Sequence, residues 1–240
     1  MSINLEQVNK YYNYKKSNQN HALRDINLKI NDGEFVAVVG KSGAGKSTLM
    51  HILACIDTFE SGSYKLNGIS ISELSDRKIS TIRNKQIGIV LQSFALVEGY
   101  TVLNNVMTPL FFSKIRSNIK RETMAIHALR QVDIEELALS KVNKISGGER
   151  QRTAIARAIV NSPSILIADE PTGALDIETS KETMKVFKAL NALGMTVIIV
   201  THDADIFKIC DRVIEISNGQ IISDKQLNIL WIIFIVIYSS

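Results

Sequence analysis

The chain has 240 residues, of which 45% are hydrophobic and 22% charged, and its formal net charge is +4. This length suffices for one large α/β domain with a full core, and the composition excludes a disordered chain. Acidic and basic residues alternate along the chain, and even the basic stretch 114–121 is typical of a solvated helix face. No nucleic-acid partner is therefore expected.

The cysteines and the two ends of the chain bear on its compartment. Cys55 and Cys210 lie among apolar residues without the spacing of a zinc site, which predicts reduced, buried thiols of the kind found in the cytosol. The polar N-terminus, residues 1–10, resembles no cleavable signal. Near the C-terminus the apolar run 229–238 has only about half the roughly twenty residues of a membrane-spanning helix. Three explanations of the tail, residues 225–240, therefore remain: a contact with a membrane or a partner, an additional buried strand, or an altered reading frame.

The N-terminal part of the chain predicts strands. Alternating and β-branched apolar residues indicate strands at 3–8 and 22–30 around a polar surface loop. Tyr11 and Tyr12 close the first strand, where an aromatic ring could stack on a nucleotide base. A turn signal at 31–34 then leads into a buried strand, residues 35–39.

The next stretch predicts a phosphate-binding loop. It fits the pattern G-x-x-x-x-G-K-[ST] and lies between a buried strand and an amphipathic helix at about 46–56, an order that a glycine-rich turn alone would not require. Its glycines allow positive φ, so that backbone N–H groups and the helix start face an anion. We expect Lys46 to reach the β- and γ-phosphates and the Ser47 hydroxyl to ligate Mg²⁺. The predicted nucleotide-binding residues here are Gly40, Lys41, Ser42, Gly43, Ala44, Gly45, Lys46, Ser47 and Thr48.

The middle of the chain predicts a helical region. After a short strand at 64–66, Ser75 or Asp76 begins a helix, and a buried strand at 86–91 ends at Gln92. The segment 101–130 is helical in pattern but broken by Pro109. The adjacent pair Phe111-Phe112 is either a docking site or part of a helical subdomain with its own small core.

Several chemically important residues follow strands in the last third of the chain. A periodic helix begins after Ser146-Gly147-Gly148 and ends near residues 161–163. The strand 164–168 ends in Asp169-Glu170, a helix follows at about 178–193, and the strand 196–200 leads to His202. Because ligands bind beyond the carboxyl ends of parallel strands, we expect these acids and His202 near the phosphate loop. Strands at 212–216 and 220–223 complete the pattern.

The order of these motifs resembles that of the nucleotide-binding subunit of ABC transporters, over about residues 3–224. It runs from the phosphate loop through Gln92, the segment 146–149, Asp169-Glu170 and Asp176 to His202. The stretches 33–40, 146–152 and 168–176 are most similar to the branch of lipoprotein-release, macrolide-efflux and antimicrobial-peptide resistance systems. The resemblance implies an α/β P-loop NTPase of ABC type in residues 1–224. It would have a mixed sheet core with helices, an N-terminal antiparallel β subdomain and a helical subdomain inserted at about 93–162.

The resemblance also implies roles for individual residues. Two copies would dimerise head to tail, with each ATP between the phosphate loop of one copy and the Ser-Gly-Gly segment of the other. Lys46, Ser47 and Thr48 would hold phosphates and Mg²⁺, Tyr12 would stack on adenine (Tyr11 if the register differs by one), and His202 would contact the γ-phosphate. Gln92 would sense metal and water, Asp169 would support Mg²⁺, and Glu170 would polarise the water. Across the dimer, the γ-phosphate would be bound by Ser146, Gly147 and Gly148, and Asp176 would organise the contact. Ile145 and Glu149 depart from the usual Leu-Ser-Gly-Gly-Gln, but the Ser-Gly-Gly is intact, so activity is expected to survive.

The expected function is that of an ATPase subunit, peripheral at the cytoplasmic face of the membrane, which drives a separate permease in export of peptide, lipoprotein or drug-like substrates. The region 92–112 is its expected docking surface. One alternative is an ABC ATPase that works a membrane partner in cell-wall or division signalling without transport. A second is an ABC ATPase acting on ribosomes or DNA, which the lack of a second cassette or long coiled coil disfavours. A small-molecule P-loop kinase would leave the segment 146–149 and His202 without a role.

Overall fold

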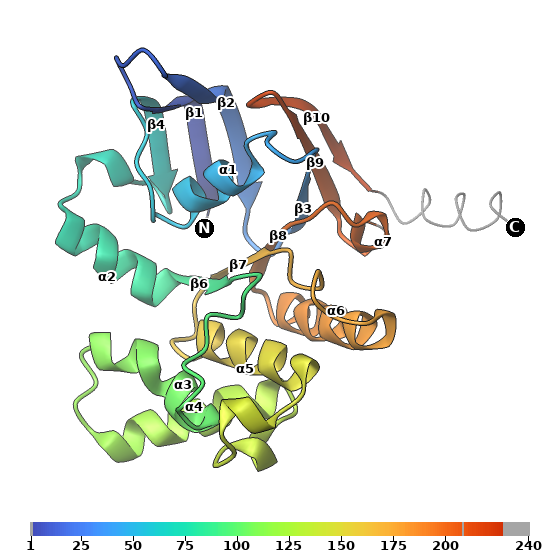
Figure 1. The fold of residues 1–240 in the computed structure, drawn as a ribbon. Coiled ribbons are helices and arrows are strands. Elements are labelled where there is room, and N and C mark those ends of the chain that lie inside the picture. The colour runs from blue at the N-terminus through green and yellow to red at the C-terminus, as the bar shows by residue number, and fades with distance from the viewer. Residues whose placement is uncertain (1, 208, 228–240) are drawn as a thin grey trace, which may run out of the picture. The chain divides into compact units, whose positions relative to one another are not determined.

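The fold is known from a computed structural model, which describes residues 2–207 and 209–227 (Figure 1). The chain forms two compact units. The first joins the N-terminal segment up to Leu74 to the segment from Thr196 onward, and the second spans Ser75–Met195. The apolar run 229–238 lies outside the described residues. Within the described part of the chain, no helix is long and apolar enough to cross a membrane.

The first unit begins with an antiparallel sheet. Its strands β1 (Ser2–Tyr12), β2 (Asn20–Asn31), β4 (Ser61–Leu66) and β5 (Ile69–Ser70) lie in the order β2-β1-β4-β5, and the short 3₁₀ helix η1 (Ile71–Glu73) follows. Apolar side chains on one face, such as Ile3, Leu5 and Leu28, are almost fully buried. This alternation is typical of a sheet with one face against a core. The expected N-terminal antiparallel β subdomain is thus confirmed.

The other strands of this unit form a mixed sheet. β3 (Phe35–Val39) lies between β8 (Thr196–Val200) and β9 (Arg212–Ser217), parallel to both, and β10 (Gln220–Gln226) pairs antiparallel with β9. Every residue of β3 and β8 is buried, as expected for parallel strands covered on both faces. The helix α1 (Lys46–Leu53) contacts both β2 and β8, and α7 (Ala204–Phe207) follows β8. The strand β10 extends to Gln226, three residues beyond its expected end.

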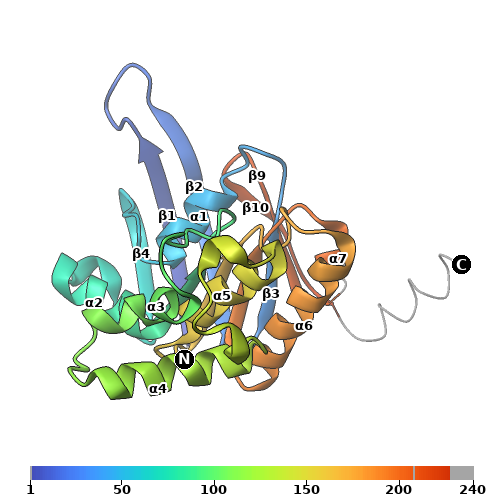
Figure 2. The ribbon, with the colours of Figure 1, turned by 60° about the horizontal axis from the view of Figure 1, so that its bottom comes forward.

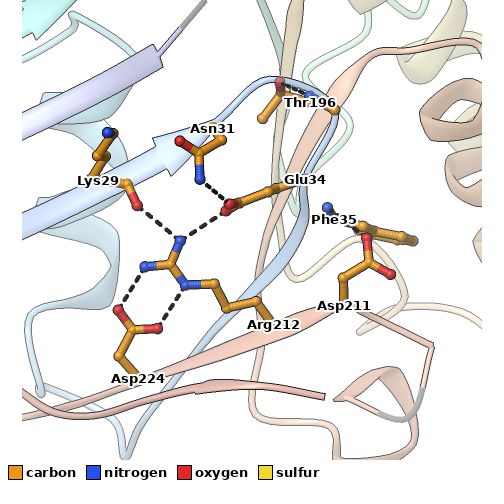
Figure 3. A network of polar contacts seen from close by, with 9 residues as sticks. Lys29, Asn31, Glu34, Phe35, Thr196, Asp211, Arg212 and Asp224 are labelled. Carbon is orange, nitrogen blue, oxygen red and sulfur yellow. Dashed lines mark hydrogen bonds and ion pairs between the residues drawn. The ribbon is translucent and has the colours of Figure 1, made fainter. Parts of the chain in front are cut away.

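A network around Arg212 joins the strands of the first unit (Figure 3). The Arg212 guanidinium donates two 2.6 Å hydrogen bonds to the Asp224 carboxylate on β10. Its third nitrogen donates to the Glu34 carboxylate and to the Lys29 carbonyl, each at 2.8 Å. The Arg212 side chain is only 11% exposed. These contacts connect β10 and β9 to the end of β2. They explain why β10 stays paired with β9 as far as Gln226, which lies opposite Arg212.

The second unit combines a parallel strand pair with helices. β6 (Ile87–Val90) is parallel to β7 (Ile165–Asp169). The helices are α2 (Asp76–Gln86), α3 (Val102–Met107), α4 (Asn118–Gln131), α5 (Gly147–Ile159) and α6 (Ile177–Ala192), with 3₁₀ turns η2 (Thr108–Phe112), η3 (Glu135–Leu137) and η4 (Val142–Lys144). Figures 1 and 2 both show α3, α4 and α5 side by side, and the three helices contact one another.

The predicted break in the 101–130 segment is larger than expected. α3 ends at Met107, Pro109 lies in η2, and no helix resumes until Asn118, where the Ser117 hydroxyl accepts a hydrogen bond from the Lys120 amide. Proline is tolerated in the first turn of a helix but cannot continue one, because it lacks an N–H. The interruption therefore needs a second helix start, which Ser117 provides.

Candidate nucleotide-binding site

The phosphate loop has the conformation that an anion-binding loop needs. Gly40, Gly43 and Gly45 all have positive φ, at 153°, 77° and 106°. A Cβ on Gly45 would lie 2.8 Å from the Ala22 carbonyl oxygen on β2, so only glycine fits there. The loop is thereby held close to β2 while its backbone turns toward the start of α1.

The helix start and Lys46 supply positive charge to this loop. Gly45 is the N-cap residue of α1, and no side chain caps the first turn. The uncapped N–H groups and the helix dipole therefore favour an anion at this point. The Lys46 ammonium donates to the carbonyls of Gly40 (2.7 Å) and Lys41 (3.1 Å), so it lies over the loop that a phosphate would approach. Ser47 is exposed beside it. These residues fit a nucleotide phosphate chain.

The two tyrosines at the end of β1 have different surroundings. The Tyr11 ring stacks on His21, with ring centroids 4.0 Å apart and planes 15° apart. The Tyr12 hydroxyl instead lies 3.3 Å from the Thr48 hydroxyl on α1 and donates to Asp57 at 3.3 Å. Of the two tyrosines, Tyr12 is therefore the one that contacts Thr48. Both rings have a neighbour, because the Lys10 ammonium lies 5.2 Å from the centroid of the Tyr12 ring.

His202 follows β8 within the same unit. The Thr201 amide donates to the Val38 carbonyl at 3.1 Å, which places the end of β8 beside the end of β3 where the phosphate loop begins. The Asp203 amide donates to the Thr201 hydroxyl at 3.1 Å, which bends the chain at His202. His202 is exposed. Within the first unit, Tyr12 thus contacts Thr48 in the first turn of α1, and His202 follows a strand end that lies beside the end of β3.

In the second unit, Ser146 and Glu149 form a capping box at the start of α5. The Ser146 hydroxyl accepts from the Glu149 amide at 3.3 Å, and the Glu149 carboxylate accepts from the Ser146 amide at 2.7 Å. The pair satisfies backbone donors and places a negative charge in the first turn. Glu149, which stands where the usual signature has Gln, therefore preserves the start of α5. Gly147 and Gly148 form the first two positions of this helix. The pattern S-x-x-E could have predicted this capping box.

Asp176 is the N-cap residue of α6. Its carboxylate accepts hydrogen bonds from the amides of Glu178 (3.0 Å) and Thr179 (2.9 Å) and from the Thr179 hydroxyl (2.6 Å). The hydrogen bonds from Thr179 lower the pKa of Asp176 below its usual range. The carboxylate is therefore ionised and held on its own helix start while remaining exposed.

Asp169, Glu170 and Gln92 lie at the ends of the parallel strands β7 and β6. Glu170 has φ 45°, so the chain turns sharply where it leaves β7. A Cβ on Gly173 would lie 3.5 Å from the Gln92 amide nitrogen and 3.6 Å from the Glu170 Cβ, so Gln92 and Glu170 flank the same point. Sequence reasoning missed Arg157, which hydrogen-bonds the loop behind Gln92. The available signal in the sequence was an arginine within the otherwise apolar run 154–160.

This strand, loop and helix, with Lys46 over the loop, define a P-loop nucleotide-binding protein. The family model described as "ABC transporter" matches residues 23–173, and the chain belongs to that family. The expected family and fold class are thus confirmed, and the chain is an ATP-binding domain and ATPase of ABC type.

Similar proteins agree with this assignment. The uncharacterized ABC transporter ATP-binding protein YvrO of Bacillus subtilis strain 168 is 41% identical over 224 residues, which are 93% of this chain and 97% of YvrO. The macrolide export ATP-binding/permease protein MacB of Neisseria meningitidis serogroup B is 40% identical, over 94% of this chain but only 35% of MacB. A solved dimeric structure, the ATP-binding cassette MJ0796 in a post-hydrolysis state bound to ADP and Pi, has 37% identity and a TM-score of 0.85, covering 94% of this chain and 99% of that chain.

Proposed function

We propose that this ATPase energises a separate membrane permease that exports peptide, lipoprotein or drug-like substrates, and that it is peripheral at the cytoplasmic face of the membrane. Two similarities support the proposal. MacB is named an export ATP-binding/permease protein, and this chain matches its length only in part. YvrO is named an ATP-binding protein and is matched over 97% of its length. An ATP-binding chain that works with a permease on another chain accounts for both.

The observation that carries the permease partner is an exposed aromatic pair beside a pocket in the second unit. Phe111 is 53% exposed and Phe112 79%. Phe112 also borders a pocket of about 470 Å³, lined by residues of α2, β6, η2 and α5 that include Arg83 and Pro109. A large apolar ring at the edge of a pocket with a partly apolar lining is a typical anchor point for a partner helix. We propose that the permease binds this surface, which combines Phe111 and Phe112 of the region 92–112 with pocket residues of α2, β6 and α5.

For the first unit we propose that Tyr12 stacks on adenine while Lys46 and the loop amides hold the phosphates. Its neighbour Thr48 would contact a phosphate, and His202 the γ-phosphate. The support is the Tyr12–Thr48 contact and the position of His202 beside the end of β3. Phosphoryl transfer requires mainly placement and charge neutralisation, which this arrangement supplies.

For the second unit we propose that Glu170 polarises the attacking water and that Gln92 senses water and metal. A carboxylate can orient water or take its proton, and the neighbouring amide of Gln92 can hold it. Gln92 and Asp169 carry oxygen atoms, the donors that Mg²⁺ prefers, and so does Ser47 of the first unit, so each of the three side chains fits this ion by its chemistry. When bound, Mg²⁺ would neutralise charge on the phosphate oxygens.

We further propose that the chain works as a homodimer with ATP at the interface. Ser146, Gly147 and Gly148 of one copy would contact the γ-phosphate bound by the other, and Asp176 would organise the contact. The cassette MJ0796 is dimeric, and the start of α5 offers the backbone N–H groups of two glycines. Because half of each site would come from the partner copy, specific activity should fall on dilution below the dimer dissociation constant.

The proposal is tested by purifying the tagged chain from native membranes, identifying the proteins that accompany it and measuring the ATPase activity of the complex. A permease that is recovered with the wild-type chain but not with a Phe112→Ala variant would support export and the docking surface. Recovery of a division or cell-wall protein, or of ribosomes, would contradict the export function while leaving the ATP site as described. Specific activity that stays constant down to the lowest measurable concentration would contradict the dimer.

A further inference from the structure

The loop that follows Gln92 has an unusual backbone. Phe94 and Ala95 are consecutive non-glycine residues with positive φ, at 58° and 49°. L-residues adopt this left-handed region only rarely, because Cβ crowds the backbone, and two in succession need external support. Two local hydrogen bonds, from Phe94 N to Leu91 O (3.0 Å) and from Ala95 N to Ser93 O (2.6 Å), tighten the turn. Neither of them connects the loop to the rest of the second unit.

Two side chains make that connection. Asn105 on α3 holds the later part of the loop, because it accepts a hydrogen bond from Val97 N (2.8 Å) and donates one to Val97 O (3.1 Å). The left-handed turn itself is held by the second side chain, Arg157. Arg157, on α5, donates from its two terminal nitrogens to the carbonyl oxygens of Ala95 and Phe94, the latter at 2.7 Å. These carbonyls belong to the two left-handed residues. A guanidinium presents donors in a rigid planar fork, so it can hold two neighbouring carbonyls at once, which an ammonium cannot do with the same geometry. Burial lowers the pKa of Arg157. An arginine side chain nevertheless keeps its proton in proteins, so the guanidinium remains charged.

The position of Arg157 links three features of the second unit. It lies on the helix that begins with the capping box, and its fork holds the loop two residues after Gln92. It also lines the pocket bordered by Phe112. β6, which leads to Gln92, packs closely on the next residue of the same helix, since a Cβ on Gly88 would lie 2.5 Å from the Ala158 carbonyl oxygen. The chain is therefore anchored on α5 four residues before Gln92 and again two residues after it.

We propose that Arg157 is a positioning residue for the ATPase reaction. It holds the left-handed turn at Phe94 and Ala95 and thereby fixes Gln92 beside Glu170, an inference that rests on the proposed role of Gln92. A partner seated in the pocket would contact the same guanidinium that fixes this loop.

The test compares the full-length wild-type chain with Arg157→Gln and Arg157→Lys. Arg121→Gln is the matched control, because Arg121 also donates from two nitrogens to a backbone carbonyl of the same unit, that of Ile115, at 3.0 and 2.6 Å. We expect Arg157→Gln to lower kcat by between about tenfold and a hundredfold, as misplacement of a catalytic group does, while KM for ATP changes less than about twofold. Arg157→Lys should fall between wild type and Arg157→Gln, and the control should keep the wild-type kcat.

Amide hydrogen exchange of residues 91–96 is the readout that a merely structural role would not single out, since the Val97 amide is held separately by Asn105. It should rise in both Arg157 variants, with the rest of the second unit unchanged, and stay at the wild-type level in the control. A kcat and exchange equal to wild type in Arg157→Gln would overturn the proposal. So would a lower kcat without faster exchange of this loop, or faster exchange throughout the unit. If Arg157→Gln does not fold, Arg157→Lys decides by the same criteria. If the wild type itself has no ATPase activity, the proposed function fails. The hold of Arg157 on the turn at Phe94 and Ala95 is tested separately, and unchanged exchange of this loop in the variants would refute it.

Discussion

Replacement of Asp224 by alanine tests whether the Arg212 network stabilises the first unit. Arg212 is 11% exposed and would keep Glu34, which is 15% exposed, but would lose both bonds to the Asp224 carboxylate. Removing one partner of a fully buried ion pair costs about 3–5 kcal/mol, whereas an exposed pair contributes about 0–1 kcal/mol. Because the Asp224 side chain is 37% exposed and a second carboxylate remains, we expect a loss of about 1–2 kcal/mol.

The assay is urea unfolding followed by circular dichroism, in which a shifted midpoint at unchanged slope reports a change in stability. In a thermal melt the same loss corresponds to about 2–8 °C for a chain of this size. Glu135→Ala is the control, since Glu135 and its partner Arg130 are 44% and 67% exposed and their pair should contribute nothing measurable. If both variants shift the midpoint equally, the network does not stabilise the fold.

The pH dependence of this loss follows from Arg212. The hydrogen bonds that Arg212 donates to the carboxylates of Asp224 and Glu34 raise its pKa above the usual value, although burial opposes them. A raised pKa in the folded state means that the stabilisation is complete below the ordinary arginine pKa and is lost only as pH rises through the folded value. The difference between Asp224→Ala and wild type should therefore be the same at about pH 7 and pH 9. A difference that shrinks over this interval would contradict the assignment to Arg212.

Three further predictions concern the site and its supports. Glu170→Gln should bind ATP with little change in affinity but hydrolyse it poorly, because an amide cannot take a proton from water; turnover of the purified variant at the wild-type rate would contradict this role. Gly88→Ala should cost about 1–3 kcal/mol in urea unfolding, because its Cβ would lie 2.5 Å from the Ala158 carbonyl oxygen; an unchanged midpoint would mean that β6 and α5 are not so close. Burial raises the pKa of Asp57, but hydrogen bonds from Lys10 and from the Thr58 amide, with other contributions, outweigh it and leave the pKa below its usual range. A lowered pKa means that this stabilisation is present above the ordinary aspartate pKa and disappears as pH falls through the folded value, so Asp57→Asn should destabilise the chain at pH 7 and converge with wild type near about pH 3.

Local patterns in the sequence determined the elements that carry the chemistry. The phosphate loop was predictable because glycine spacing, a buried strand and a helix start are all encoded within about fifteen consecutive residues, which is the range of these signals. β3 and β8 were predictable as core strands because strands covered on both faces are continuous apolar runs. The ABC family followed from the order of such local motifs, each readable on its own.

The tertiary structure decided what depends on register and on contacts between distant residues. Tyr11 and Tyr12 are equivalent in sequence, and the pairing of β1 with β2 brings Tyr11 onto His21 and leaves Tyr12 to reach Thr48. The fork of Arg157 meets carbonyls more than sixty residues earlier in the chain. Local patterns reflect the preferences of residues a few positions apart, whereas the acceptors of a guanidinium can come from any part of the chain that the fold places beside it. Local patterns therefore cannot specify such pairs.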